Sequence, residues 1–154
     1  MKLTTRSHYS VKALLDLSLQ PVGTLSSVKS IAQRQQLPAP YLEKLLIELR
    51  RSQLVVSVRG SHGGYRLAKH PSQISLGQIL EAVGESQSPL WFAMHAQGEQ
   101  AGDAEQAEDW VTSMLWQRLN QKLKEAFHSI TLEDLYYDAR SWQAAQGEGA
   151  SFVI

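Results

Sequence analysis

An abrupt change in hydrophobic period constrains this chain more than any other feature of its sequence. Four leucines occupy the i, i+3, i+4 and i+7 positions of one helical face: Leu42, Leu45, Leu46 and Leu49. Residues 54–58 then form a run rich in β-branched side chains, which favours a strand. A turn with three glycines over residues 59–64 allows the chain to return as a second strand. The pattern predicts a helix that leads directly into a β-hairpin.

Two further helices are expected before this leucine-rich helix. Residues 7–19 have apolar side chains at helical spacing, with Ser7 as a candidate cap, and a shorter helix begins near Ser27. Residues 36–38 make a tight turn, and Pro40 suits the first turn of the leucine-rich helix. Two helices joined by a tight turn and followed by a two-stranded hairpin give the order of elements in a winged helix-turn-helix.

The second half of the chain is predicted to be helical after an irregular segment. Ser75 and Gln78 resemble a capping box that opens a short helix, and residues 86–108 show little regularity. A long helix is expected from about Asp109 to Ile130. Its apolar face is wider than one short domain needs, so we expect two copies of the chain to dimerise, with the helices crossing antiparallel, through Val111, Leu115, Leu119, Leu123, Phe127 and Ile130.

A new helix cap over residues 131–134 opens a shorter helix that is expected to fade near Gln143. The predicted fold is therefore mainly α with a small β-hairpin. We expect four parts: a winged helix-turn-helix domain over residues 1–84, a variable loop over 85–108, a dimerisation helix with a short following helix over 109–145, and a mobile tail over 146–154.

The net charge of zero hides an uneven distribution. Residues 1–83 hold eleven Lys and Arg against four Asp and Glu, a formal charge of +7, whereas residues 84–154 hold four against eleven, a formal charge of −7. A basic part beside an acidic part indicates a polyanion such as nucleic acid as the partner of the basic part alone. The alternative is that both parts only have solvated surfaces.

Specific side chains could read DNA. On the outward face of the leucine-rich helix, Glu43 can accept from a cytosine amino group, and Lys44 can reach guanine or phosphate. Arg59 at the mouth of the glycine-rich hairpin suits a narrow, electronegative minor groove. The alternative for each is a solvated surface charge that contacts nothing. The remaining candidates are three phosphate contacts, Arg6, Lys12 and Arg51, together with Tyr41, Gly60 and Ser61.

Other classes of site find little support. The chain has no cysteine, which excludes disulfides and thiolate-bound metals, and its five histidines show no paired ligand spacing, so no metal site is expected. There is no phosphate-binding glycine loop or nucleophile elbow, so we do not expect an enzyme. No run is apolar and long enough for a signal peptide or a membrane span, and we expect a cytoplasmic protein without a membrane partner.

Short motifs distributed over residues 1–140 carry a family resemblance. They lie at residues 1–4, 9–13, 41–45, 54–60, 63–67, 74–79, 81–85, 115–116 and 130–135. Together they resemble the Rrf2 family, the IscR, NsrR and CymR type of transcription regulators. The resemblance implies a homodimer that binds double-stranded DNA through the winged helix-turn-helix, with the long helix as the dimer contact.

Several members of that family carry a 2Fe–2S or 4Fe–4S cluster held by three cysteines before the long helix. This sequence departs from that pattern, because Phe92 and Trp110 stand where the first and last cysteines would fall, and Ser113 falls near a histidine of some members. Thiolates are the usual ligands of iron–sulfur clusters. We therefore predict a regulator with no cofactor.

Two alternatives to a cofactor-free DNA-binding regulator stay open. The winged helix could be a module that pairs with another protein, or the regulator could bind a cluster or small ligand through groups other than cysteine. Trp91, Phe92 and Met94 could pack beside Trp110 and Trp116 as core filler. They could also line an apolar pocket for an unknown small ligand or a partner protein.

Overall fold

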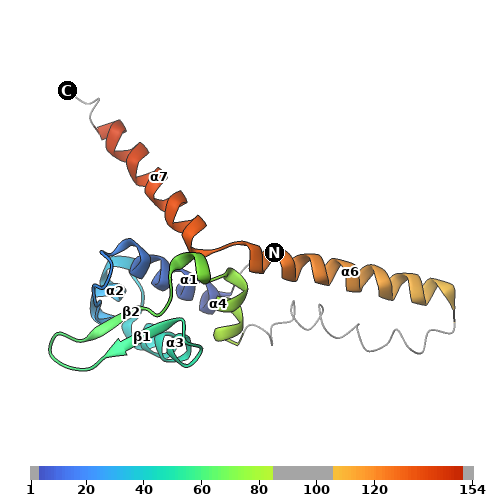
Figure 1. Ribbon diagram of the computed structural model, residues 1–154, viewed down its shortest axis with the longest axis horizontal. Coiled ribbons are helices and arrows are strands. Elements are labelled where there is room, and N and C mark those ends of the chain that lie inside the picture. The colour runs from blue at the N-terminus through green and yellow to red at the C-terminus, as the bar shows by residue number, and fades with distance from the viewer. Residues whose placement is uncertain (1–3, 85–105, 151–154) are drawn as a thin grey trace.

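The computed structural model describes residues 4–84 and 106–150, with side chains described as far as Gly147. In these ranges the elements are α1 (Thr5–Leu19), α2 (Val28–Gln35), α3 (Ala39–Arg51), β1 (Val55–Val58), β2 (Gly64–Leu67), the 3-10 turn η1 (Pro71–Gln73), α4 (Leu76–Ala82), α6 (Ala107–Ser129) and α7 (Leu132–Ala150). Figure 1 shows α1 to α4 and the hairpin gathered in one body, from which α6 and α7 extend in different directions. The mainly α fold with a small β-hairpin is confirmed.

The core of the body forms where α1, α2 and α3 meet. Leu14 of α1 and Ile31 of α2 are fully buried, and so are the four leucines of α3 that set the helical period: Leu42, Leu45, Leu46 and Leu49. Burial of each such side chain contributes on the order of 1.5–3 kcal/mol. The apolar stripe read from the sequence therefore holds the helix-turn-helix together, and the opposite face of α3 is left outside.

The start of α2 agrees with the prediction from the sequence, whereas the cap of α1 differs from it. As predicted, α2 begins next to Ser27, and the structure shows that Ser27 caps the helix by accepting a hydrogen bond from the amide of Ser30. The cap of α1 is Thr4, whose side chain accepts from the amide of Ser7, so the prediction of Ser7 as the cap is wrong. Ser7 lies within the first turn of the helix and is buried, because α1 begins earlier than its apolar residues indicate.

The hairpin pairs β1 with β2 in antiparallel register, with Val58 opposite Gly64. A further bridge joins β2 to the segment before α2: the amide of Ser26 donates to the carbonyl of Tyr65 at 2.9 Å, and the amide of Tyr65 donates back at 2.8 Å. The hairpin is thus a wing attached to the helix-turn-helix by backbone hydrogen bonds.

The junction between α6 and α7 is built into the body. The amide of Leu76 donates to the carbonyl of Ile130, and the amide of Leu132 donates to the carbonyl of Ile74, each at 2.8 Å. Ile74 and Leu132 are fully buried in the same core as the helix-turn-helix leucines. We call the body formed by α1 to α4 and the hairpin the reading head. The reading head and the base of α6 therefore form one packed unit.

Both helix starts near this junction are capped as predicted. Ser75 and Gln78 form a complete capping box at α4. At α7, the amide and hydroxyl of Thr131 donate to Asp134, whose own amide donates back to the Thr131 hydroxyl at 3.2 Å. Reciprocal bonds of this kind satisfy amides that have no partner inside a helix.

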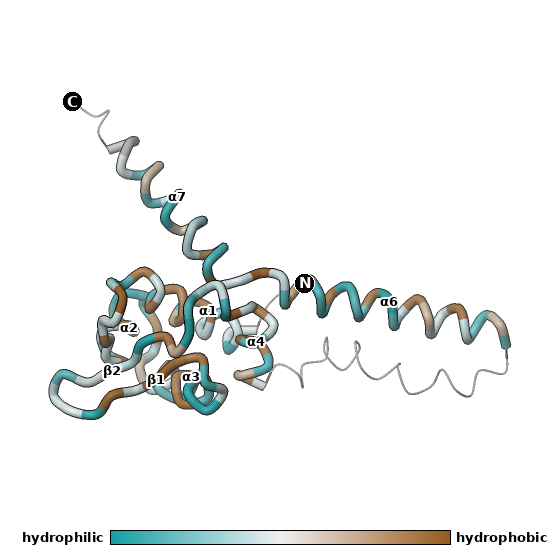
Figure 2. Tube along the Cα trace, viewed as in Figure 1, coloured by the Kyte–Doolittle hydropathy of each residue, from teal (hydrophilic) through white to brown (hydrophobic). Residues whose placement is uncertain are grey.

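The length of α7 differs from the prediction. The helix continues to Ala150 instead of fading near Gln143, so the first part of the predicted tail is helical, and residues 151–154 lie outside the described part. Ala144, Ala145 and Gln146 are strong helix formers, although they add nothing to an apolar period. Along α6, polar and apolar positions alternate (Figure 2). No helix in the described ranges combines the length and apolarity that a membrane span requires.

Candidate nucleic-acid interface

The outward face of α3 presents the residues predicted to meet bases. Glu43 and Lys44 are exposed on the side of the helix opposite the buried leucines, and within the described ranges neither forms an ion pair. Tyr41 is less exposed, and a DNA contact by this residue remains an untested prediction. Its ring is half-buried against the core and meets the ring of Tyr9 edge-on, with centroids 5.8 Å apart. The base-reading candidates are therefore free, whereas the ring of Tyr41 helps to seat α3 on α1.

The tip of the wing is shaped by glycines and carries one cation. Arg59, Gly60 and Ser61 are exposed, and the loop that joins β1 and β2 projects beyond the helical body (Figure 1). Gly60 has a φ of +125°, a backbone conformation that residues with a side chain rarely adopt. A Cβ on Gly63 would lie 2.1 Å from the carbonyl oxygen of Val58, so no side chain fits there. The turn therefore brings bare backbone and a free guanidinium to one projecting end.

The end of α3 supplies a contact that sequence reasoning did not predict. Nη1 of Arg50 donates to the hydroxyl of Ser57 in β1 at 3.2 Å and so ties the helix to the wing. Arg51, the neighbouring phosphate candidate, is exposed and has no side-chain partner within the described residues. Adjacent arginines thus differ in role: one holds two elements together, and the other remains available to a ligand.

The structure gives two predicted phosphate contacts intramolecular partners. The guanidinium of Arg6 pairs with Glu48 of α3 and donates to the carbonyl of Val83 at the end of α4. Nζ of Lys12 donates to the carbonyl of Gln35 at 2.8 Å, at the C-terminal end of α2, where a cation is favourable. Both side chains therefore stabilise the packing of the reading head, and a phosphate contact by either remains an untested prediction.

The predicted dimerisation face divides into two parts. Val111, Leu115 and Leu119 are 58%, 58% and 45% exposed, and Ile130 is 38% exposed. Phe127, in contrast, is buried against Leu80 of α4, and Leu123 packs against the same pair. Most of the apolar surface of Phe127 is covered by its own chain, because the base of α6 lies on α4, and a dimer contact by Phe127 remains an untested prediction. The outer turns keep an uncovered apolar face.

The residues present do not fit a cysteine-ligated iron–sulfur cluster. The chain contains no cysteine, and in the described residues no three His, Asp or Glu side chains come together as a metal-ligand set. Of the positions where the family's cysteines and histidine were expected, Trp110 is an exposed indole and Ser113 is half-buried at the start of α6. Phe92 and the other aromatics of the 86–105 segment lie outside the described residues. No thiolate donor is available.

Comparisons with known proteins agree with this architecture. Residues 3–138 match the sequence model of the Rrf2 family, described as an iron-dependent transcriptional regulator. The Synechocystis protein slr0846, named as an HTH-type transcriptional regulator, is 61% identical over 155 residues, covering 100% of both chains. The regulator IscR of Cereibacter sphaeroides is 37% identical, covering 88% of this chain and 86% of its own.

Solved structures show the same likeness. IscR of T. potens superposes with a TM-score of 0.71 at 36% identity, covering 93% of this chain and 91% of its own. The structure titled CymR, the global cysteine regulator of B. subtilis, has a TM-score of 0.69 at 32% identity, covering 89% of this chain and 97% of its own. Each of these likenesses covers at least 89% of this chain.

Proposed function

This chain belongs to the Rrf2 family of transcription regulators, and we propose that it binds specific DNA sequences as a homodimer without a cysteine-ligated cluster. Members of the family are DNA-binding regulators and not enzymes. The observation that carries the finer proposal is the joint exposure of Lys44 and Glu43 on α3 and of Arg59 on the projecting wing. The two elements offer a helix to the major groove and a cation to the minor groove of one duplex.

The uncovered outer part of α6 supports the dimer. Val111, Leu115 and Leu119 repeat every four residues and leave a continuous apolar strip on a helix of 23 residues. Two such strips can cover each other in a symmetric, self-complementary contact. Because the base of α6 is packed on α4, the pairing would hold two reading heads at a fixed spacing, and neighbouring major grooves lie about 34–36 Å apart.

The proposal is tested by selecting duplexes from a random pool with the purified protein. We expect enrichment of an inverted repeat, because a two-fold homodimer presents two equivalent recognition helices. Arg59→Ala should lower affinity about ten-fold and reduce any preference for an A/T-rich segment. Lys44→Ala or Glu43→Ala should alter base preference at positions within each half-site.

The selected duplex also separates DNA binding from protein pairing. The affinity of the parent should fall steeply as salt rises, since phosphate contacts release counterions. A pool without enrichment, together with no salt-sensitive binding of any duplex, would contradict the proposal. That result would favour the alternative, a winged helix that pairs with another protein.

A further inference from the structure

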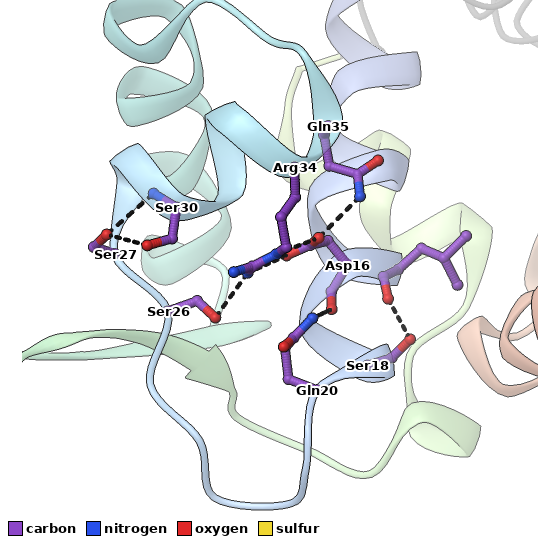
Figure 3. A network of polar contacts seen from close by, with 9 residues as sticks. Asp16, Ser18, Gln20, Ser26, Ser27, Ser30, Arg34 and Gln35 are labelled. Carbon is purple, nitrogen blue, oxygen red and sulfur yellow. Dashed lines mark hydrogen bonds and ion pairs between the residues drawn. The ribbon is translucent and has the colours of Figure 1, made fainter.

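A buried carboxylate in α1 binds two side chains of α2. Asp16 is 3% exposed and accepts two hydrogen bonds in a fork from Arg34 of α2, Nε to Oδ1 at 3.0 Å and Nη2 to Oδ2 at 2.7 Å. Gln35 adds a third bond, Nε2 to Oδ1 at 2.9 Å. The hydrogen bond to Asp16 raises the pKa of Arg34. Figure 3 shows these groups converging between α1 and α2.

The same guanidinium reaches the point where the wing is attached. Nη2 of Arg34 donates to Oγ of Ser26 at 3.0 Å, and Ser26 is 4% exposed. The backbone of Ser26 makes both hydrogen bonds of the bridge to Tyr65 in β2. Arg34 therefore connects the buried carboxylate of Asp16 to Ser26, the residue whose backbone hydrogen bonds attach the wing to the helical body.

The wing packs closely against Ser26 at Gly64. Gly64 precedes Tyr65 and has a φ of +155°, and a Cβ on it would lie 2.6 Å from the carbonyl oxygen of Ser26. Gly64 pairs across the hairpin with Val58, the residue immediately before Arg59. A shift of Ser26 would therefore displace Gly64 and, through the pairing with Val58, the strand end that carries Arg59. Arg34 could instead serve only to add positive charge near DNA. That role would not explain why its guanidinium forms two hydrogen bonds with the buried carboxylate of Asp16.

We propose that Arg34, held by Asp16, is a positioning residue that fixes the wing, and with it Arg59, relative to the recognition helix α3. Arg34 then contributes to specificity without touching a base. The inference rests on the proposed function, because it assumes that the wing contacts DNA.

The first test measures wing position without DNA. Since the chain has no cysteine, Ser61→Cys at the wing tip and Gln33→Cys in α2 provide two unique sites for spin labels. We expect a narrow distance distribution in the parent and a distribution at least about twice as wide with Arg34→Lys, because an ammonium keeps the charge but cannot form the fork. Ser26→Ala, which removes only the last link, should also broaden it. An unchanged distribution in both variants would overturn the proposal.

A matched control and the DNA readout complete the experiment. Ser18→Ala removes a hydroxyl that donates to the carbonyl of Leu15 in its own helix, and it should leave the distribution unchanged. With the selected duplex, Arg59→Ala should weaken the parent about ten-fold and the Arg34→Lys protein less than about two-fold, whereas Lys44→Ala should weaken both equally. Equal effects of Arg59→Ala in both backgrounds would contradict the proposal. Absence of binding by the parent would contradict the proposed function, while the spin-label distances would still decide the role of Arg34.

Discussion

The imidazole of His128, in the last turn of α6, occupies the space that a side chain at Gly77 of α4 would need. A Cβ on Gly77 would lie 2.6 Å from Cε1 of His128 and 2.7 Å from both ring nitrogens. Nδ1 of the ring is 3.2 Å from Oγ of Ser75, and Nε2 is 3.4 Å from Oε1 of Glu81. A side chain at position 77 would therefore require the His128 ring to move. This contact lies where the base of α6 packs on α4.

Gly77→Ala should lower the free energy of unfolding by about 1–2 kcal/mol, because the new methyl group displaces the ring. In a His128→Ala background the same change should raise it by about half a kcal/mol, since alanine is the better helix former and the space is then empty. Urea denaturation of the four proteins measures both values. If Gly77→Ala destabilises the two backgrounds equally, the ring is not the obstacle.

Leu115→Asp should convert a dimer into a monomer. The parent is expected to sediment at about twice 17.2 kDa, and a charge placed within the paired apolar strips would have to be desolvated. Leu115 is more suitable than Leu123, which packs against Leu80 and Phe127 of its own chain. Gln121→Asp, which introduces the same charge at an exposed position of α6, should stay dimeric. A parent that sediments as a monomer at micromolar concentration would exclude the dimer.

Arg6→Ala and Arg51→Ala should separate structural from phosphate-contacting cations. Arg6 pairs with Glu48 and bonds the carbonyl of Val83, so its loss should lower the stability of folding by about 1 kcal/mol, a value limited by partial exposure. Arg51→Ala should leave stability unchanged and reduce the slope of log affinity against log salt by about 1. Thermal unfolding and salt titration measure the two effects. If Arg6→Ala instead left stability unchanged and reduced the salt slope, the intramolecular partners of Arg6 would contribute little to folding.

The start of α7 should respond to acid. Hydrogen bonds from the backbone and side chain of Thr131 hold the pKa of Asp134 below its ordinary value. A lowered pKa in the folded state means that the cap contributes its full stability above about pH 4 and loses it as the pH falls through the lower value. The amide resonance of Thr131 should therefore titrate with a midpoint below the ordinary pKa of an aspartate, and in Asp134→Asn it should not titrate. A midpoint at or above that ordinary value in the parent would contradict this.

Protein purified without oxygen should be colourless, with no stoichiometric iron or sulfide. The chain offers no thiolate, and clusters held only by histidine and carboxylate ligands are uncommon. Visible absorption and metal analysis provide the measurement. A brown sample whose affinity for the selected duplex changes when iron is removed would show that other ligands hold a cluster.

The sequence alone determined the elements whose signals are local. These signals are the leucine period of α3, the β-branched run of β1 and the capping box that begins at Ser75. Each acts within a few residues, so the structure of each element follows from short-range geometry. The exposure of Glu43 and Lys44 follows as well, because burying one face of a helix turns the other outward.

Only the tertiary structure decided which element packs on each apolar helix face and which partner pairs with each buried charge. The period of α6 marks Leu115 and Phe127 alike as apolar, but packing on α4 buries one and leaves the other exposed. Asp16 lies beside buried positions of α1, a sign that it needs a partner, yet nothing local identifies Arg34 eighteen residues later. A periodic pattern shows which side of an element must leave water. The partner that covers it is set by contacts between residues distant in sequence, for which one sequence carries no signal.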